Sequence, residues 1–163
     1  MVEVYVGAGS NIEPARHLKL AAAALAERFP GLRCSDVYRS PAFGFTGAPF
    51  LNMVFAFEFT GSPDDVEREL NDIEYEGGRV RRGERFSSRT LDLDLLLFGG
   101  MVDAERRLPR DDVLRYPFVL GPLAEIAPDL RHPLTGRPIG VEWAERRAEA
   151  TRLERVGPLE RAA

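Results

Sequence analysis

Two aspartates at positions 92 and 94 are the most specific chemical feature of the sequence. Asp92 and Asp94 lie in the segment Leu91–Phe98, which reads LDLDLLLF. In a strand, side chains two residues apart share a face and lie about 6.5–7 Å apart. Aspartate is disfavoured in strands, and two carboxylates on one face repel each other unless a cation lies between them. Hard cations such as Mg²⁺ bind oxygen ligands and often substrate phosphates. The pair therefore favours a metal site, with an amphipathic strand and a solvated outer face as the alternative.

An arginine-rich segment directly precedes this pair. Residues 77–91 read GGRVRRGERFSSRTL and contain five arginines and one glutamate, in a chain whose net charge is −4. Guanidinium groups bind phosphate oxygens bidentately, and carboxylate-held metals bridge the same phosphates. A solvated basic hairpin is the alternative for the segment alone, but the two features together favour phosphoryl-type transfer. The glycine boundaries and the scarcity of apolar residues predict a lid that closes over a triphosphate.

A third group of residues is aromatic. Phe43, Phe45 and Phe50 lie in the glycine- and proline-rich segment 41–50, and Asn52 follows it. Exposed rings in loops often stack on planar ligands. Most phenylalanines belong to hydrophobic cores, however, so a core role is the alternative interpretation of these rings.

The composition excludes several other classes of protein. The chain has 163 residues, which indicates a single domain over residues 1–163. One cysteine and two histidines disfavour a disulfide or a zinc site rich in these residues. The sequence contains no secretory signal and no apolar run of the roughly 20 residues that a membrane span needs. The negative net charge disfavours a nucleic acid partner. We therefore expect a cytoplasmic protein that acts without a membrane or nucleic acid.

The order of predicted elements indicates the fold. Alternation, caps and glycine or proline boundaries predict strands at 2–6, 32–40, 51–59 and 91–98, a turn at 7–11, and helices from 14 to about 29 and from 63 to the glycines at 77 and 78. The resulting β-α-β-β-α-β order predicts a ferredoxin-like α+β sandwich, with an antiparallel sheet and both helices on one face. Beyond residue 100 we expect extra elements, with helices near 117–126 and 142–152.

Alternation also assigns the faces of two predicted strands. In the strand 51–59 the odd-numbered residues are apolar and belong to one face, and Asn52 lies on the other. In the strand 91–98 the leucines at 91, 93, 95 and 97 are expected beneath the helices, which leaves Asp92 and Asp94 on the opposite face.

Six segments, in this order and spacing, closely resemble the 6-hydroxymethyl-7,8-dihydropterin pyrophosphokinases of folate biosynthesis over residues 2 to about 130. The segments are GSN (9–11), YRSPAFG (38–44), FLN (50–52), IE with GRVR (73–81), RFSSRTLDLD (85–94) and PFVLGPLAEIAPDL (117–130). The resemblance implies a ferredoxin-like core with C-terminal additions. It also implies pyrophosphate transfer from ATP to the pterin hydroxymethyl group, release of AMP, and two Mg²⁺ ions.

The resemblance assigns roles residue by residue. Asp92 and Asp94 would bind the metals. The residues that act on the transferred group would be Arg81, Arg82, Arg89 and Asp94, with Arg79 also on the triphosphate. Nucleotide contacts are implied for Asn71, Glu74 and Leu95. They are also implied for Phe86, Arg110 and Tyr116, which stand where the family often has Trp, His and Arg.

The pterin would lie between Phe50 and Phe118, and Asn52 would form hydrogen bonds with its edge. Ser40, Pro41 and Phe43 would line the pocket. The implied partners are ATP and the pterin, and we expect a monomer.

Two other classes share this order of elements. An RNA-recognition module would carry stacking rings and a basic face on its central strands, but the last strand here offers two carboxylates that would repel phosphate without a metal. A non-catalytic ligand-binding regulatory domain would account for a pocket but not for five arginines beside two aspartates.

Overall fold

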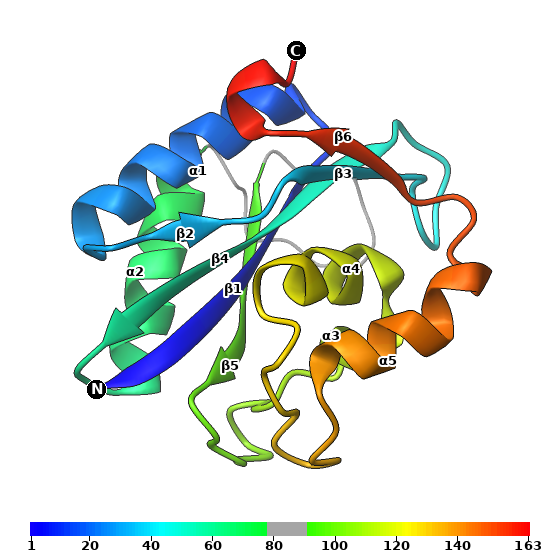
Figure 1. The fold of residues 1–163 in the computed structure, drawn as a ribbon. Helices are drawn as coiled ribbons and strands as arrows, with labels where there is room; N and C mark the ends of the chain where they lie inside the picture. Colours follow the sequence, from blue (N-terminus) through cyan, green and yellow to red (C-terminus); the bar gives the residue numbers. More distant parts are fainter. Residues whose placement is uncertain (78–90) are drawn as a thin grey trace.

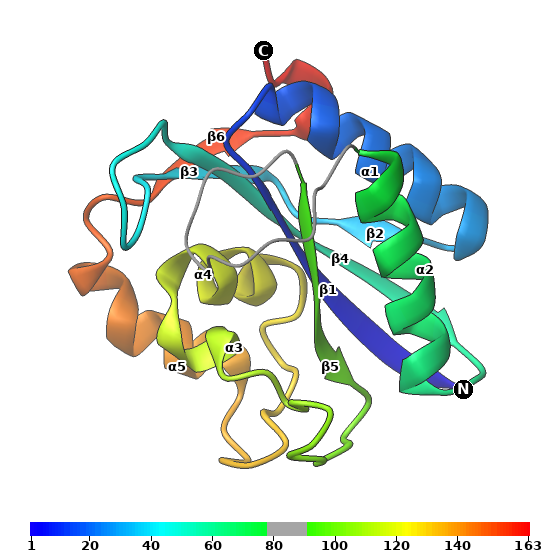
Figure 2. The same cartoon turned by 180° about the vertical axis from the view of Figure 1, so that it is seen from behind.

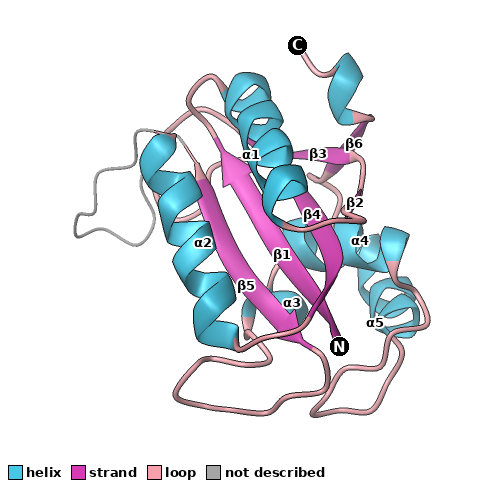
Figure 3. Cartoon of the chain, turned by 90° about the vertical axis from the view of Figure 1, so that its left-hand side faces the viewer, coloured by secondary structure: helices cyan, strands magenta, loops and turns pink. Residues whose placement is uncertain are grey.

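The computed structural model describes residues 1–77 and 91–163. An antiparallel sheet is covered on one face by α1 and α2 and on the other by α3, α4 and α5 (Figures 1 and 3). The strands are β1 (Val2–Ser10), β2 (Arg33–Cys34), β3 (Val37–Ser40), β4 (Phe50–Phe59), β5 (Asp92–Phe98) and β6 (Glu154–Gly157). The helices are α1 (Pro14–Arg28), α2 (Pro63–Glu76), α3 (Asp112–Arg115), α4 (Pro117–Ile126) and α5 (Ile139–Arg146), with short 3₁₀ turns η1 (Arg147–Glu149) and η2 (Leu159–Arg161).

The order of strands confirms the predicted ferredoxin-like fold. The sheet runs β5-β1-β4-β3-β6, β2 also pairs with β4, and every pairing is antiparallel. Helices α1 and α2 lie side by side on one face, as predicted, and Figure 2 shows them from the other side. Within the described ranges, no helix is both long and apolar enough to span a bilayer.

The sheet separates two hydrophobic cores. The core beneath α1 and α2 contains Leu18, Leu70, Phe55 and Phe57, all nearly inaccessible to water. The core on the opposite face packs α3, α4 and α5 against side chains such as Val54. The predicted alternation of β4 is therefore confirmed. Both faces of this strand are covered, because odd-numbered residues such as Phe55 pack in one core and even-numbered residues such as Val54 pack in the other.

The predicted strand at 32–40 is divided into β2 and β3. At the division, the backbone N–H of Ser35 donates to the carbonyl of Val54 at 2.9 Å. The N–H of Val54 in turn donates to the hydroxyl of Ser35, also at 2.9 Å. The serine side chain thus replaces a backbone acceptor, which interrupts the regular pairing.

A β-bulge corrects one prediction about β5. Val6 pairs with Leu95 and Tyr5 pairs with Leu97, so Leu96 is an extra residue in this strand. Leu97 was expected beneath the helices, but it lies in the core of the opposite face, together with Leu96. The bulge lies beyond the two aspartates, so their shared face is unaffected.

The first strand is longer than predicted. Residues 7–10, expected as part of a turn, continue β1 as far as Ser10. Gly9 pairs with Asp92 on one side and with Asn52 on the other. This pairing places two glycines in the middle of the sheet, between the strands that carry the polar residues.

The C-terminal part departs most from the sequence-based prediction. The helix at 117–126 is confirmed, whereas the helix expected at 142–152 forms earlier, as α5. The strand β6 then pairs with β3 at the edge of the sheet. Leu159 and Ala162 pack into the core beneath α1, so these residues complete the folded unit.

Candidate active site

The candidate site is a cavity of about 310 Å³ on the sheet face that carries Asp92 and Asp94. Its floor comes from β1, β4 and β5, and its walls come from the segment 41–50, the loop before α3 and the start of α4. All the residues expected at the pterin and the metal line it, namely Ser40, Pro41, Phe43, Phe50, Asn52, Asp92, Asp94 and Phe118, and so do Arg110 and Tyr116, which were expected at the nucleotide. The structure therefore brings together residues that are up to 78 positions apart in the chain.

Gly7 and Gly9 form the centre of the floor. Gly9 lies between Asp92 and Asn52 in the sheet, and Gly7 lies between Asp94 and Val54. A Cβ atom on Gly9 would lie 3.4 Å from Oδ1 of Asn52, and one on Gly7 would lie 3.4 Å from the Leu96 side chain. Because neither glycine has a side chain, the floor is open between the Asn52 amide and the Asp92 and Asp94 carboxylates, which lie about two strand spacings away.

Asn52 is held firmly at one end of this floor. Its side chain is buried, and Nδ2 donates to the Ser40 hydroxyl at 2.9 Å and to the Tyr38 carbonyl at 3.2 Å. These two bonds use both hydrogens of the amide. The Asn52 carbonyl oxygen is therefore the atom through which the side chain can accept a hydrogen bond from a ligand.

Aromatic rings form the walls beside Asn52. Phe118 stacks on Tyr116 with 5.0 Å between ring centroids, and Phe43 meets Tyr116 edge-on at 5.4 Å. Phe45 meets Phe50 edge-on at 6.2 Å. Phe43 is 53% exposed, and the rings of Phe45, Phe50 and Phe118 are only partly buried. These four phenylalanines therefore line the cavity, and Phe118 also packs against the core beneath α4.

The aspartate pair occupies the opposite end. Burial raises the pKa of Asp94 well above its usual value, and the neighbouring Asp92 raises it further, while Arg110 opposes the shift. The two carboxylates therefore favour a cation between them, and their oxygen atoms suit Mg²⁺. In residues 1–77 and 91–163, no group of three or more His, Cys, Asp or Glu side chains is placed to hold a metal. Water and phosphate oxygens would have to supply the other ligands.

Three charged residues before and within α3 complete this end of the cavity. Arg110 Nη2 lies 3.5 Å from Oδ1 of Asp94, and its Nε lies 3.3 Å from Oδ2 of Asp112. Arg107 lies 4.0 Å from Asp112 and also lines the cavity. Sequence reasoning missed Arg107 and Asp112, although the charged run RRLPRDD at 106–112 was a visible signal.

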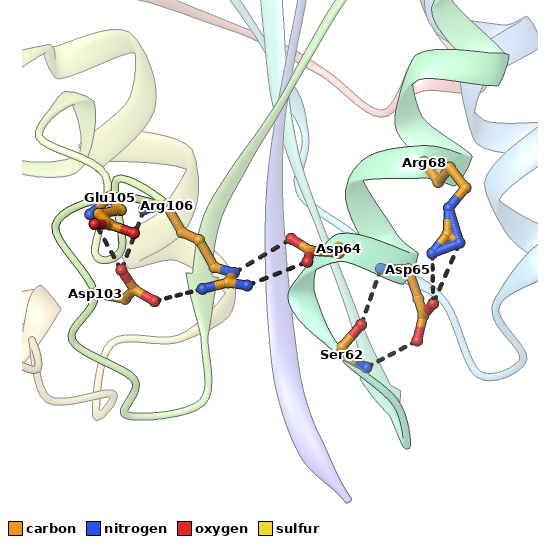
Figure 4. A network of polar contacts seen from close by, with 7 residues as sticks. All are labelled: Ser62, Asp64, Asp65, Arg68, Asp103, Glu105 and Arg106. Atoms are coloured by element: carbon orange, nitrogen blue, oxygen red, sulfur yellow. Dashed lines mark hydrogen bonds and ion pairs between the residues drawn. The ribbon is translucent and has the colours of Figure 1, made fainter.

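A network of ion pairs attaches this loop to the start of α2 (Figure 4). Arg106 donates to both carboxylate oxygens of Asp64, at 3.2 and 3.1 Å, and to Asp103 at 2.8 Å. Beside it, Ser62 and Asp65 form a reciprocal capping box at the first turn of α2. Arg106 directly precedes Arg107, so the network fixes the backbone from which Arg107 and Arg110 reach the cavity.

Three residues expected at the nucleotide do not line the cavity. Glu74 is buried on α2, and its Oε2 accepts a hydrogen bond of 2.8 Å from the backbone N–H of Leu93, between the two aspartates. Asn71 is exposed on α2, and Leu95 belongs to the core beneath α1 and α2. Glu74 thus holds in place the strand that carries Asp92 and Asp94.

The remaining predicted residues belong to the arginine-rich segment. Arg79, Arg81, Arg82, Phe86 and Arg89, and with them the predicted lid, lie outside the described residues.

Comparison with known proteins gives a consistent result. The family model for 7,8-dihydro-6-hydroxymethylpterin-pyrophosphokinase (HPPK) matches residues 5–128. A Pseudomonas aeruginosa protein named 2-amino-4-hydroxy-6-hydroxymethyldihydropteridine pyrophosphokinase is 43% identical over 136 residues, which cover 80% of this chain and 83% of that protein. A Synechocystis protein of the same name is 38% identical over 139 residues, covering 82% of this chain and 71% of its own length.

The solved structures match in fold. The crystal structure of Plasmodium falciparum HPPK-DHPS with pterin and p-hydroxybenzoate has a TM-score of 0.72 and 10% identity, and the match covers 94% of this chain. This chain covers 46% of that longer protein. At such low identity the likeness concerns the fold alone.

Proposed function

Because the chain belongs to the 7,8-dihydro-6-hydroxymethylpterin-pyrophosphokinase family, we propose that it transfers a pyrophosphoryl group from ATP to 6-hydroxymethyl-7,8-dihydropterin. The acceptor is the hydroxymethyl oxygen, and the second product is AMP. This reaction is a step of folate biosynthesis. The comparisons leave the RNA-binding and regulatory-domain alternatives without support.

One observation supports this function best. A single open floor joins a buried amide between aromatic rings, at Asn52, to a carboxylate pair, at Asp92 and Asp94. The first end suits a flat heterocycle with a donor edge, and the second suits a metal–polyphosphate. A hydroxymethyl group on the heterocycle would then point along the floor towards the phosphates.

The pterin lies between Phe50 and Phe118 in this proposal. One ring face of Phe118 is already covered by Tyr116, so the pterin stacks on its other face. The Asn52 carbonyl accepts a hydrogen bond from an N–H donor of the pterin edge, while Ser40 holds the amide in this orientation. Pro41 and Phe43 close the side of the pocket.

Asp92 and Asp94 hold two Mg²⁺ ions in this proposal. The support is the shared face, the oxygen donors and the raised pKa of Asp94. Mg²⁺ held by these carboxylates would supply positive charge that offsets the charge of the phosphate oxygens. In the transfer step the hydroxymethyl oxygen forms a bond to the β-phosphorus, and the bond from that phosphorus to the α-phosphate oxygen breaks. The electron pair leaves with AMP, and Asp94 can accept the hydroxyl proton.

The proposed nucleotide contacts come from residues inside and outside the ranges that the structure describes. Arg110 and Tyr116 reach the phosphate end and the wall of the cavity. Arg79, Arg81, Arg82 and Arg89 contact the triphosphate, and Arg81, Arg82 and Arg89 act on the transferred group. The support for these arginines is the positive charge of their segment and the family resemblance. Phe86, Asn71, Glu74 and Leu95 are assigned to the nucleotide on the resemblance alone, and the side chains of Glu74 and Leu95 are buried outside the cavity.

In this proposal residues 1–163 form one domain, which acts on small molecules in the cytoplasm as a monomer. The support for one domain is that residues from both ends of the chain pack in the core beneath α1. The net charge of −4 supports the absence of a nucleic acid partner.

The test is the identity of the nucleotide product. With ATP, Mg²⁺ and 6-hydroxymethyl-7,8-dihydropterin, we expect AMP to form in equal amount to the pterin diphosphate, and no AMP to form without the pterin or with EDTA. Quantitative chromatography measures both products. Formation of ADP in place of AMP would rule out pyrophosphoryl transfer.

A further inference from the structure

Arg110 places a positive charge beside Asp94, at the end of the cavity where a metal would be expected. Its backbone N–H donates to the carbonyl of Leu96 at 2.9 Å, which attaches the residue to β5. From there its guanidinium reaches Asp94, with 3.5 Å between Nη2 and Oδ1. The Arg110 side chain is only 17% exposed, so this positive charge is poorly screened by water.

Asp112 holds the other side of the same guanidinium. Its Oδ2 lies 3.3 Å from Nε of Arg110, and its side chain is 14% exposed. Among the described residues, neither Arg110 Nε nor Asp112 Oδ1 has a hydrogen-bond partner. The guanidinium therefore lies between two carboxylates at ion-pair distance, without a directed bond through Nε that would fix it to either.

This arrangement has a consequence for metal binding. A cation that approaches Asp94 meets the Arg110 charge beside Oδ1, and the two positive charges repel each other at this carboxylate. The guanidinium can leave Asp94 while it stays beside Asp112. A polyphosphate offers oxygen atoms that suit a displaced guanidinium.

We propose that Arg110 is an exchangeable counter-ion of the metal site: it neutralises Asp94 in the metal-free protein, and it moves from Asp94 to the phosphate chain when metal and nucleotide bind, with Asp112 as its retained partner. The proposal rests on the assignment of Asp92 and Asp94 to the metal. Under this proposal the metal binds weakly before the nucleotide is present. Binding of the metal and the nucleotide is then coupled, because the phosphate chain receives the guanidinium that the metal displaces.

The experiment measures Mn²⁺ binding to the protein alone, by electron paramagnetic resonance of the free ion. Arg110→Gln removes the competing charge, so we expect Mn²⁺ affinity to rise about tenfold. Arg107→Gln removes an equal charge from the same cavity, but this arginine is 48% exposed and pairs only loosely with Asp112. For this control we expect a change of no more than about twofold. Arg110→Lys keeps the charge and should bind Mn²⁺ nearly as weakly as the unaltered protein.

If Arg110→Gln binds Mn²⁺ no more tightly than Arg107→Gln does, the proposal is overturned. The double variant Arg110→Gln/Asp94→Asn separates this failure from failure of the proposed function. If the double variant binds Mn²⁺ as tightly as Arg110→Gln alone, the metal is not at Asp94, and the metal assignment is wrong. If it loses the tight binding, while Arg110→Gln has gained it, the metal assignment and the counter-ion role are both supported.

Discussion

At the residue scale, the site depends on its glycines as much as on its functional side chains. Gly9 stands between Asp92 and Asn52 in the sheet, and a longer side chain there would fill the floor next to the Asn52 carbonyl. The sequence predicted the roles of Asp92 and Asn52 from chemistry and resemblance. It did not predict the role of Gly9, because two glycines in GAGSN are typical of a turn, and the strand pairing of Gly9 depends on residues 43 and 83 positions away.

The raised pKa of Asp94 leads to a prediction about stability. A carboxyl whose pKa is raised in the folded protein binds its proton at higher pH than it does in the unfolded chain. Its ionised form therefore destabilises the metal-free protein above the raised pKa, and this cost disappears as pH falls through that pKa towards the usual value. We expect metal-free Asp94→Asn to unfold at a higher temperature than the unaltered protein at pH 7, and the difference to shrink as pH falls.

Calorimetry over this pH range measures the effect, with and without Mg²⁺. Mg²⁺ should stabilise the unaltered protein but not Asp94→Asn, and the variant should lose about 100-fold or more of its turnover. An unchanged response to Mg²⁺ in the variant would remove Asp94 from the metal site.

A second prediction concerns the ring of Phe118. Phe118→Ala removes stacking and apolar contact area, so we expect pterin binding to weaken by about 1–3 kcal/mol. Binding of an ATP analogue measured alone should barely change. Isothermal titration with each ligand separates the two effects, and Val141→Ala, an exposed position on α5, controls for the loss of an apolar side chain. Equal losses for both ligands would mean that Phe118 supports the fold rather than the pterin.

At the element scale, the position of β5 is set from three sides. β1 pairs with it, Glu74 of α2 accepts a bond from its backbone between the two aspartates, and Arg110 donates to Leu96 at the bulge. The loop that follows β5 is in turn attached to α2 through Arg106 and Asp64. Helix α2 therefore positions both the carboxylates and the arginines that face them.

This arrangement gives a prediction for Arg106. Arg106→Gln breaks the bidentate pair with Asp64, so the loop that carries Arg107 and Arg110 loses its attachment to α2. We expect kcat/KM for ATP to fall several-fold, while pterin binding alone and the fold remain unchanged, because the pair is exposed and contributes little to stability. Steady-state kinetics measure the effect. Arg68→Gln, which breaks an exposed ion pair on α2 alone, is the matched control and should behave as the unaltered protein. A similar loss in both variants would exclude a positioning role for Arg106.

The helices and strands also show how much of the fold could be predicted from the sequence. The order of the first five long elements follows from alternation, the serine N-cap at Ser62 and glycine boundaries, and the structure confirms it. The bulge at Leu96 was not predictable from alternation, because LDLDLLLF ends in an unbroken apolar run that fits either face. The strand β6 was missed because the segment ERVG is short and polar, and its pairing is set by the distant edge of β3.

At the scale of the whole molecule, the two faces of one sheet have different tasks. The face beneath α1 and α2 carries a dense apolar core that fixes the strand register. The opposite face is shared between a second core and the cavity, so the floor of the cavity is rigid sheet and its walls are loops and helix ends. Such a scaffold holds two ligands at a fixed separation, which in-line transfer between them requires.

The most direct test of this account is the distance between the metal and the pterin when both are bound. Mn²⁺, an ATP analogue with a methylene bridge between the α- and β-phosphorus, and 6-hydroxymethyl-7,8-dihydropterin are bound together, and the relaxation of the pterin hydroxymethyl protons is measured by nuclear magnetic resonance. Asn52 and Asp92 are two strand spacings apart, so we expect strong paramagnetic relaxation corresponding to about 10 Å or less. The effect should disappear in the double variant Asp92→Asn/Asp94→Asn. Relaxation no faster than with diamagnetic Mg²⁺, while both ligands are bound, would contradict a shared site.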